Sequence, residues 1–195
     1  MKEQIKLEEI VGYLPYGLKY YNEHSYKKGI EHTLIELDTY GFIELINYEA
    51  PAMLSDSHIK PILHPLSDLT KEIEVNGEKF VPIIKLYKLS NERNYNDNID
   101  FEFIESWGAG KILKVYHDKE RKSYTEFIYN DYNFRKTTLY CEGCYNFGMY
   151  LPHNISVSSE IYNQYLLFQK LYQWHFDIHN LIERGLGIDI NTLEK

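Results

Sequence analysis

Two cysteines and two histidines form the group in this sequence whose types and spacing could hold a metal ion. Cys141 and Cys144 frame a Cys-x2-Cys turn, and His175 and His179 lie four residues apart farther along the chain. Two thiolates on one turn can bind one zinc ion, and histidines four apart on a helix face the same way, so tetrahedral zinc is geometrically conceivable. A zinc-stabilised adaptor is therefore one interpretation of the chain.

The spacing of this group favours a simpler interpretation. Thirty residues separate Cys144 from His175, which is far longer than in a compact zinc finger, and both histidines fall among apolar residues. Hydrogen-bonded core histidines are common in such surroundings. We therefore expect a hairpin turn at the cysteines, buried or partner-facing histidines, and no cofactor, with zinc as the alternative.

No motif of useful catalytic specificity is present. Gly108-Ala109-Gly110-Lys111 lacks the full phosphate-loop spacing and precedes a strand pattern, so we expect a hairpin turn there. Glu120-Arg121-Lys122 lies in a charged run typical of a solvated turn. Gly-x-Ser-x-Gly and His-Glu-x-x-His are both missing. We expect no enzyme.

An enzymatic alternative stays open because histidines distant in sequence can converge in space. Such a protein would be a small enzyme or a nucleic-acid-processing factor that uses histidines and carboxylates. The scattered histidines are His58, His64, His117 and His153.

Aromatic residues are interleaved with lysine and arginine in the strand-like part of the chain from Tyr116 to Tyr140. Such side chains could contact a partner or stack on single-stranded bases, although ordinary sheet packing explains them as well. The candidate partner-binding residues are Trp107, Tyr116, Tyr124, Tyr129 and Phe134.

The charge balance narrows the class of partner. The 195 residues include 21 Lys and Arg against 29 Asp and Glu, which gives a net charge of −8. This excess of acid argues against a broad phosphate-binding surface, so direct nucleic-acid binding is not expected. An acidic surface can face a basic groove on a protein partner, or can serve solubility alone.

The sequence gives no sign of a membrane. It contains no run of about 18 apolar residues, and no basic-then-apolar leader follows Met1. We expect no membrane partner and a cytoplasmic location.

The N-terminal half predicts a short helix followed by a meander. Lys2–Val11 favours a helix that ends at Gly12 and Pro15. Three β-patterned segments then follow, separated by short turns. These segments are Leu18–Glu23, Gly29–Asp38 and Phe42–Tyr48.

The middle of the chain predicts a short helix and then a second group of strands. Ser67 is a good N-cap for a two-turn helix ended by Asn76-Gly77, and Phe80–Ile84 favours an extended segment. The polar stretch Asn91–Asn98 is a candidate boundary. The strands expected beyond it are Ile99–Ser106, Lys111–His117, Ser123–Asn130 and Phe134–Tyr140.

A long amphipathic helix is predicted near the C-terminus, from Glu160 to Arg184. Ser156, Ser158 or Ser159 could cap it, and Gly185 would end it. Its apolar arc is wider than a surface helix needs, so we expect it to lie between two layers or to meet a partner. The whole chain is thus expected to be a single α+β domain over residues 1–195, with antiparallel meanders and a β-rich insertion at about 87–151.

Three stretches of the chain resemble an uncharacterised protein family of Bacteroidota phages and integrated mobile elements. Together they cover about a third of the chain. They are Tyr13–Lys19, Lys60–Ile73 continuing to Asn76–Ile83, and Trp174–Asp177 with Leu181–Leu193.

The resemblance implies a biological setting rather than a reaction. Proteins of this kind are small phage accessory proteins, and those without catalytic motifs often block a host machine. We therefore expect a non-enzymatic protein that binds a host or phage macromolecule in a bacterial cell. Its sharpest form is an anti-CRISPR-like inhibitor of an RNA-guided defence nuclease, with the specific function in the β-rich insertion.

Overall fold

The structure is a computed structural model, and the chain divides into two compact units. It describes residues 3–22, 31–46, 52–90, 100–106, 110–116, 123–130, 133–140, 156–159 and 164–193, and between 100 and 159 it describes side chains only for Glu102 and Val115. The first unit comprises Met1–Leu66 with Phe168–Lys195, and the second comprises Ser67–Leu167. Together they form an α+β fold, as the sequence predicts. The interpretation as one domain with an insertion stays a prediction.

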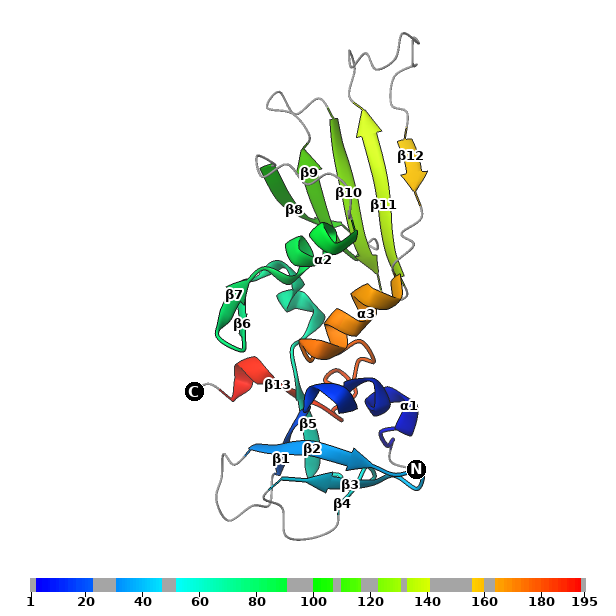
Figure 1. The fold of residues 1–195 in the computed structure, drawn as a ribbon, viewed down its shortest axis with the longest axis vertical. Helices are drawn as coiled ribbons and strands as arrows, with labels where there is room; N and C mark the ends of the chain where they lie inside the picture. Colours follow the sequence, from blue (N-terminus) through cyan, green and yellow to red (C-terminus); the bar gives the residue numbers. More distant parts are fainter. Residues whose placement is uncertain are drawn as a thin grey trace. The chain divides into compact units, whose positions relative to one another are not determined.

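A six-stranded sheet is the base of the first unit (Figure 1). Its order is β13-β5-β1-β2-β3-β4, in which β13 runs parallel to β5 and the other neighbours are antiparallel. The predicted meander is confirmed, because β1, β2 and β3 are consecutive neighbours. The strands are β1 (Lys19–Asn22), β2 (Glu31–Leu37), β3 (Phe42–Leu45), β4 (Ala52–Met53), β5 (Ile59–Leu63) and β13 (Ile188–Asp189).

Short helices precede this sheet. Helix α1 (Leu7–Ile10) continues directly into the 3-10 helix η1 (Val11–Tyr16), and a left-handed Gly17 with φ of 63° ends it. The predicted short helix is α1, which ends at Ile10 just before Gly12, although the chain continues through Gly12 and Pro15 as a 3-10 helix. A 3-10 helix accommodates Pro15 in its last turn, and Gly12 is needed for another reason: a Cβ at this position would overlap the ring of Tyr172.

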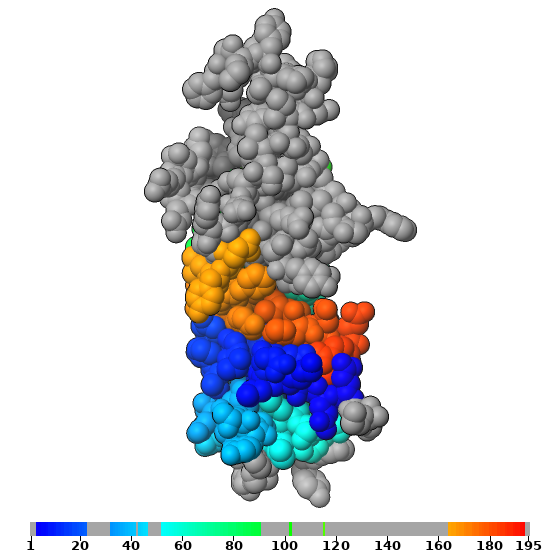
Figure 2. Space-filling model, turned by 90° about the vertical axis from the view of Figure 1, so that its right-hand side faces the viewer, coloured from blue at the N-terminus to red at the C-terminus, as the bar shows by residue number. Residues whose placement is uncertain are grey.

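The core of the first unit lies between the sheet and these helices. On the face seen in Figure 2, the blue N-terminal residues lie between the light-blue and cyan strands and the orange and red C-terminal residues. Buried side chains come from all three parts, so each part covers apolar surface of the other two. They include Ile10, Tyr13, Leu18, Tyr20, Leu34, Ile43, Leu45, Ile59, Leu63 and Leu181.

The long C-terminal helix is the largest error of the sequence prediction, because α3 spans only Gln164–Gln173. The helix ends in a Schellman motif, in which Phe176 N–H donates to Leu171 O and His175 N–H donates to Tyr172 O. His175 takes the left-handed position of this motif with φ of 54°, where glycine is usual. The sequence carries no glycine there to mark the end.

Gly185 does end a helical turn, as predicted, but a short one. It has φ of 71°, and the N–H groups of Gly185 and Leu186 donate to the carbonyls of Ile182 and Leu181 in a second Schellman motif. The chain then enters β13 and a final 3-10 helix, η3 (Ile190–Thr192).

The second unit begins with three elements that the sequence prediction places incorrectly. The expected helix at Ser67 is the 3-10 helix η2 (Leu66–Thr70), followed by the hairpin β6 (Ile73–Val75) and β7 (Glu78–Phe80). Asn76 and Gly77 both have positive φ, which a two-residue hairpin turn requires. The segment expected to be extended is helix α2 (Pro82–Ser90), in which Pro82 takes the first position, where its missing N–H costs nothing.

An antiparallel five-stranded sheet, of order β12-β11-β10-β9-β8, completes the second unit. Four strands confirm the sequence prediction closely. The fifth strand, β12, contains the serines that the sequence analysis expected to cap the long helix. These serines pair with β11 instead. The strands are β8 (Asp100–Ser106), β9 (Gly110–Tyr116), β10 (Ser123–Asn130), β11 (Asn133–Tyr140) and β12 (Ser156–Ser159). The predicted boundary at Asn91–Asn98 lies outside the described residues.

In the part of the chain that the structure describes, every helix is too short or too polar to cross a membrane.

The contact between Gly12 and Tyr172 can be tested with a double-mutant cycle. Gly12→Ala is expected to lower the free energy of unfolding by about 1–3 kcal/mol, because the added methyl group displaces a packed ring. In a Tyr172→Ala background the same change should cost much less. Chemical denaturation of the four proteins measures both values, and additive costs would contradict the contact.

Candidate functional site

His175 and His179 lie in the segment between α3 and β13, and not on one face of a helix as the zinc interpretation requires. The Nε2 atom of His175 is 3.0 Å from the carbonyl oxygen of Tyr16, to which it can donate. Tyr172 Oη and His179 Nε2 are 3.2 Å apart. Each histidine therefore uses Nε2 in a contact within the first unit, and the geometric premise of the predicted pair is wrong.

The other two predicted zinc ligands, Cys141 and Cys144, lie outside the described residues, as do His117 and His153. Among the residues that are described, no three His, Cys, Asp or Glu side chains are grouped to hold a metal ion. Zinc at the cysteines stays a prediction.

The segment around His175 is fixed to strand β5 by backbone hydrogen bonds. His64 N–H donates to His175 O at 2.8 Å, and Asp177 N–H donates to His64 O at 2.9 Å. Tyr13 Oη donates to Phe176 O at 2.6 Å. The histidine predicted as a converging catalytic group, His64, thus contributes its backbone to a structural bridge.

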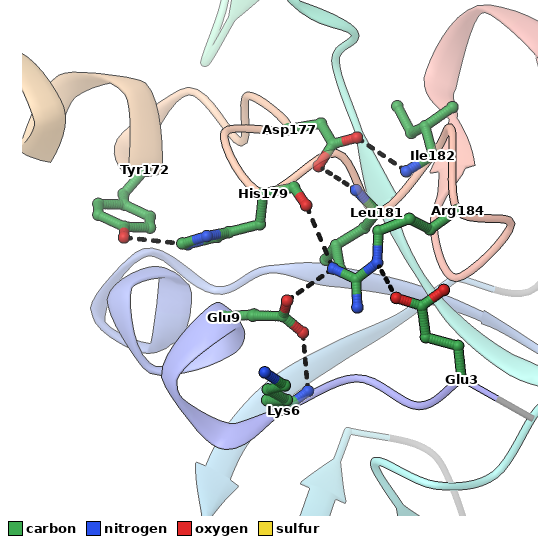
Figure 3. Close-up of polar contacts among 9 residues, drawn as sticks. All are labelled: Glu3, Lys6, Glu9, Tyr172, Asp177, His179, Leu181, Ile182 and Arg184. Carbon is green, nitrogen blue, oxygen red and sulfur yellow. Dashed lines mark hydrogen bonds and ion pairs between the residues drawn. The ribbon is translucent and has the colours of Figure 1, made fainter. Parts of the chain in front are cut away.

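Asp177 organises the turn that follows this bridge (Figure 3). Its two carboxylate oxygens accept from the N–H groups of Leu181 and Ile182, both at 2.8 Å. The side chain is buried, and desolvation raises the pKa of its carboxyl, although these hydrogen bonds oppose the rise. Asp177 therefore works as a cap for backbone donors rather than as an exposed acid.

Arg184 joins the C-terminal segment to the N-terminal helix (Figure 3). Its Nη1 donates to Glu9 Oε1 at 2.6 Å, and its Nε donates to Glu3 Oε1 at 2.8 Å. Glu9 is the buried partner, with 13% of its side chain exposed against 60% for Glu3. Glu9 Oε2 also accepts from Lys6 N–H at 2.8 Å, so this one carboxylate satisfies two donors.

The titration of these groups follows from burial and charge. Burial would raise the pKa of the Glu9 carboxyl, but the hydrogen bonds from Arg184 and Lys6 lower it overall. Burial lowers the pKa of both His175 and His179, against a hydrogen bond to Tyr16 in the first case and the nearby Glu9 charge in the second. Both imidazoles are therefore held neutral near pH 7.

A cavity of about 510 Å³ lies beside Arg184 in the first unit. Its charged lining consists of two acids, Glu3 and Asp56, and two bases, Lys60 and Arg184. Arg184 already pairs with Glu3, and Asp56 accepts from Met53 N–H at 2.9 Å. With two acids and two bases in its lining, the cavity favours neither an anionic nor a cationic ligand.

Four of the five predicted partner-binding aromatics fall in strands of the five-stranded sheet. Its register pairs Tyr116 with Tyr124 and Tyr129 with Phe134. Trp107 and the side chains of the other four lie outside what the structure describes. Their role in binding stays a prediction.

The β2–β3 hairpin of the first unit has an exposed surface that the sequence analysis did not single out. Ile35 is 49% exposed, Ile46 is 44% exposed, and Tyr40 in the connecting turn is 82% exposed. Glu36 and Glu44 are exposed between the two isoleucines and the turn. We call Ile35, Glu36, Glu44 and Ile46 the hairpin face.

In comparisons with known proteins, no family model, no curated protein and no solved structure matches this chain. The resemblance to phage accessory proteins therefore stays a prediction.

Replacing the two carboxylates that pair with Arg184 one at a time should show how much each contributes to stability. Glu9→Gln is expected to lower the free energy of unfolding by about 1–3 kcal/mol, because an amide has one acceptor oxygen for two donors. The matched change Glu3→Gln should cost less than about 1 kcal/mol, since that pair is exposed. Thermal and chemical denaturation measure both, and equal costs would contradict the assignment.

The lowered histidine pKa values predict a loss of stability in acid. As pH falls below about 6.5, the unfolded chain binds a proton that the folded imidazole does not, so the free energy of unfolding falls by at most about 1.4 kcal/mol per pH unit for each histidine. His175→Gln keeps a donor for Tyr16 O but does not titrate. Denaturation between pH 7.5 and 5 should give this variant a shallower slope than the wild type, and identical slopes would refute the prediction.

Proposed function

We propose that this chain is a non-enzymatic accessory protein of a phage or mobile element that acts by binding a protein partner in its bacterial host. The observation that carries the proposal is the hairpin face, where apolar side chains and carboxylates are exposed together on two paired strands. An exposed apolar group rimmed by polar residues is typical of an interaction surface.

The use of the polar groups in the first unit supports the same proposal. Asp177, Glu9 and Arg184 bind backbone or each other, and His175 and His179 make hydrogen-bonding contacts within the unit. A general acid or base must instead have the atom that donates or accepts the proton within reach of a substrate. These groups stabilise the fold, and the proposed partner would bind to exposed residues instead.

The net charge of −8 and the phage-like segments suggest which partner to test first. Proteins that handle nucleic acids carry basic grooves, and an acidic protein can occupy such a groove. Inhibition of a host defence system, in the manner of an anti-CRISPR protein acting on an RNA-guided nuclease, is the sharpest form of the proposal.

Affinity capture tests the proposal directly. The tagged protein, incubated with lysate of a Bacteroidota host, is expected to retain one protein in stoichiometric amount, identified by mass spectrometry. An unrelated acidic protein of similar size and charge is the control, because it shows which proteins bind to negative charge alone.

Failure to recover any stoichiometric partner from lysates of infected and uninfected cells would contradict the proposed function. If a partner is found but an RNA-guided nuclease still clears its target plasmid in the presence of this protein, only the inhibitor form is wrong.

A further inference from the structure

The residue pattern of β2 shows that the hairpin face is a consequence of a strand irregularity. In a regular strand side chains alternate between faces, so Leu34 and Glu36 would share one face and Ile35 and Leu37 the other. The observed register pairs Leu34 with Leu45 and Glu36 with Glu44, which leaves Ile35 as an extra residue in a bulge. Leu34 is buried, Leu37 is partly buried against the core, and Ile35 and Glu36 are both exposed.

Because of the bulge, Leu34 and Leu37 both face the core, while Ile35 faces solvent. Ile46 N–H donates to Thr33 O at 2.9 Å, which places Ile46 across from Thr33 and next to Ile35 on the outer surface. Two β-branched apolar side chains therefore lie close together in solvent. The very exposed Tyr40 adds an aromatic side chain at the end of the same hairpin.

The two carboxylates of this face lie directly opposite each other in the strand register. Glu36 and Glu44 are register partners, and like charges directly opposite destabilise a sheet. Within the described part of the chain neither carboxylate takes part in an ion pair. On the neighbouring strand β1, Lys19 donates to Thr33 Oγ1 at 2.9 Å.

We propose that the hairpin face docks a segment of a partner protein in which an arginine or lysine stands between apolar side chains. The cation would lie between Glu36 and Glu44 and relieve their repulsion, and arginine is the better fit because its fork can donate to both carboxylates. The apolar neighbours would cover Ile35 and Ile46, with Tyr40 as an aromatic anchor. This assignment rests on the proposed function and names the surface and the partner chemistry.

The same charges disfavour the other macromolecules that could cover an open sheet face. The phosphates of nucleic acids and the head groups of anionic lipids would both meet the two exposed carboxylates of Glu36 and Glu44. A basic protein segment is the class of occupant whose charge complements the face and whose side chains match its apolar part.

A display library of random linear peptides tests the proposal without knowledge of the natural partner. Selection on the full chain is expected to enrich peptides that combine arginine or lysine with aromatic or aliphatic residues. A synthetic copy of an enriched peptide should bind on the order of tenfold or more weakly to the Glu36→Lys/Glu44→Lys variant. The control Glu72→Lys/Glu183→Lys changes the net charge equally at two other exposed sites and should bind as the wild type does.

The single variant Glu36→Lys separates binding from folding. It places an ammonium group opposite Glu44, so its melting temperature should equal or exceed that of the wild type while peptide binding falls. Acidic enriched peptides, no enrichment at all, or equal binding by the wild type and both hairpin variants would overturn the proposal.

Failure of the hairpin-face proposal can be distinguished from failure of the proposed function. A natural partner captured equally well by the wild type and by Glu36→Lys/Glu44→Lys would leave partner binding intact and remove the hairpin face as its site. Absence of any captured partner would remove the function itself.

Discussion

The first unit depends on the backbone bridge between His64, at the end of β5, and the segment from His175 to Asp177. Its two hydrogen bonds stop α3 from continuing and turn the chain so that β13 can lie parallel to β5. The N-terminal helices close over the same segment through Tyr13 and Tyr16, which bind Phe176 and His175. Arg184 reaches Glu9 only because the chain has turned back, so the ion pair is a consequence of the bridge. Sheet, helices and C-terminal segment therefore share one core.

The sequence predicts those parts of this fold whose signals are local. Strand alternation located β1 to β3 and β8 to β11 within a few residues, because a half-buried strand shows its period directly. The long helix was wrong because His175 takes a left-handed position normally held by glycine, and because its partner, His64, lies far away in the sequence. The overly wide apolar arc was the available signal. It combines two short segments, each ended by its own Schellman motif.

The candidate site was harder to predict than the fold. The sequence analysis chose residues by chemical type, and three of the described ones, His64, His175 and His179, proved to be parts of the scaffold. The hairpin face has no motif, since a register shift between Leu34 and Glu36 decides which side chains reach solvent. The pattern of two leucines three apart in a strand, with an isoleucine and a glutamate between them, is the trace that a bulge leaves. Asn76-Gly77 was likewise a hairpin signal assigned to a helix end.

In the first unit, the described polar network fixes the C-terminal segment, while isoleucine, tyrosine and glutamate side chains of the β2–β3 hairpin are exposed and form the surface that we propose for a partner. The most direct measurement of these two roles is hydrogen–deuterium exchange of the full chain with and without a captured partner. The account predicts slower exchange on binding in residues 33–46, with little change in residues 174–187, which are already hydrogen-bonded in the free protein. Protection confined to the strands between 100 and 140, with residues 33–46 unchanged, would contradict it.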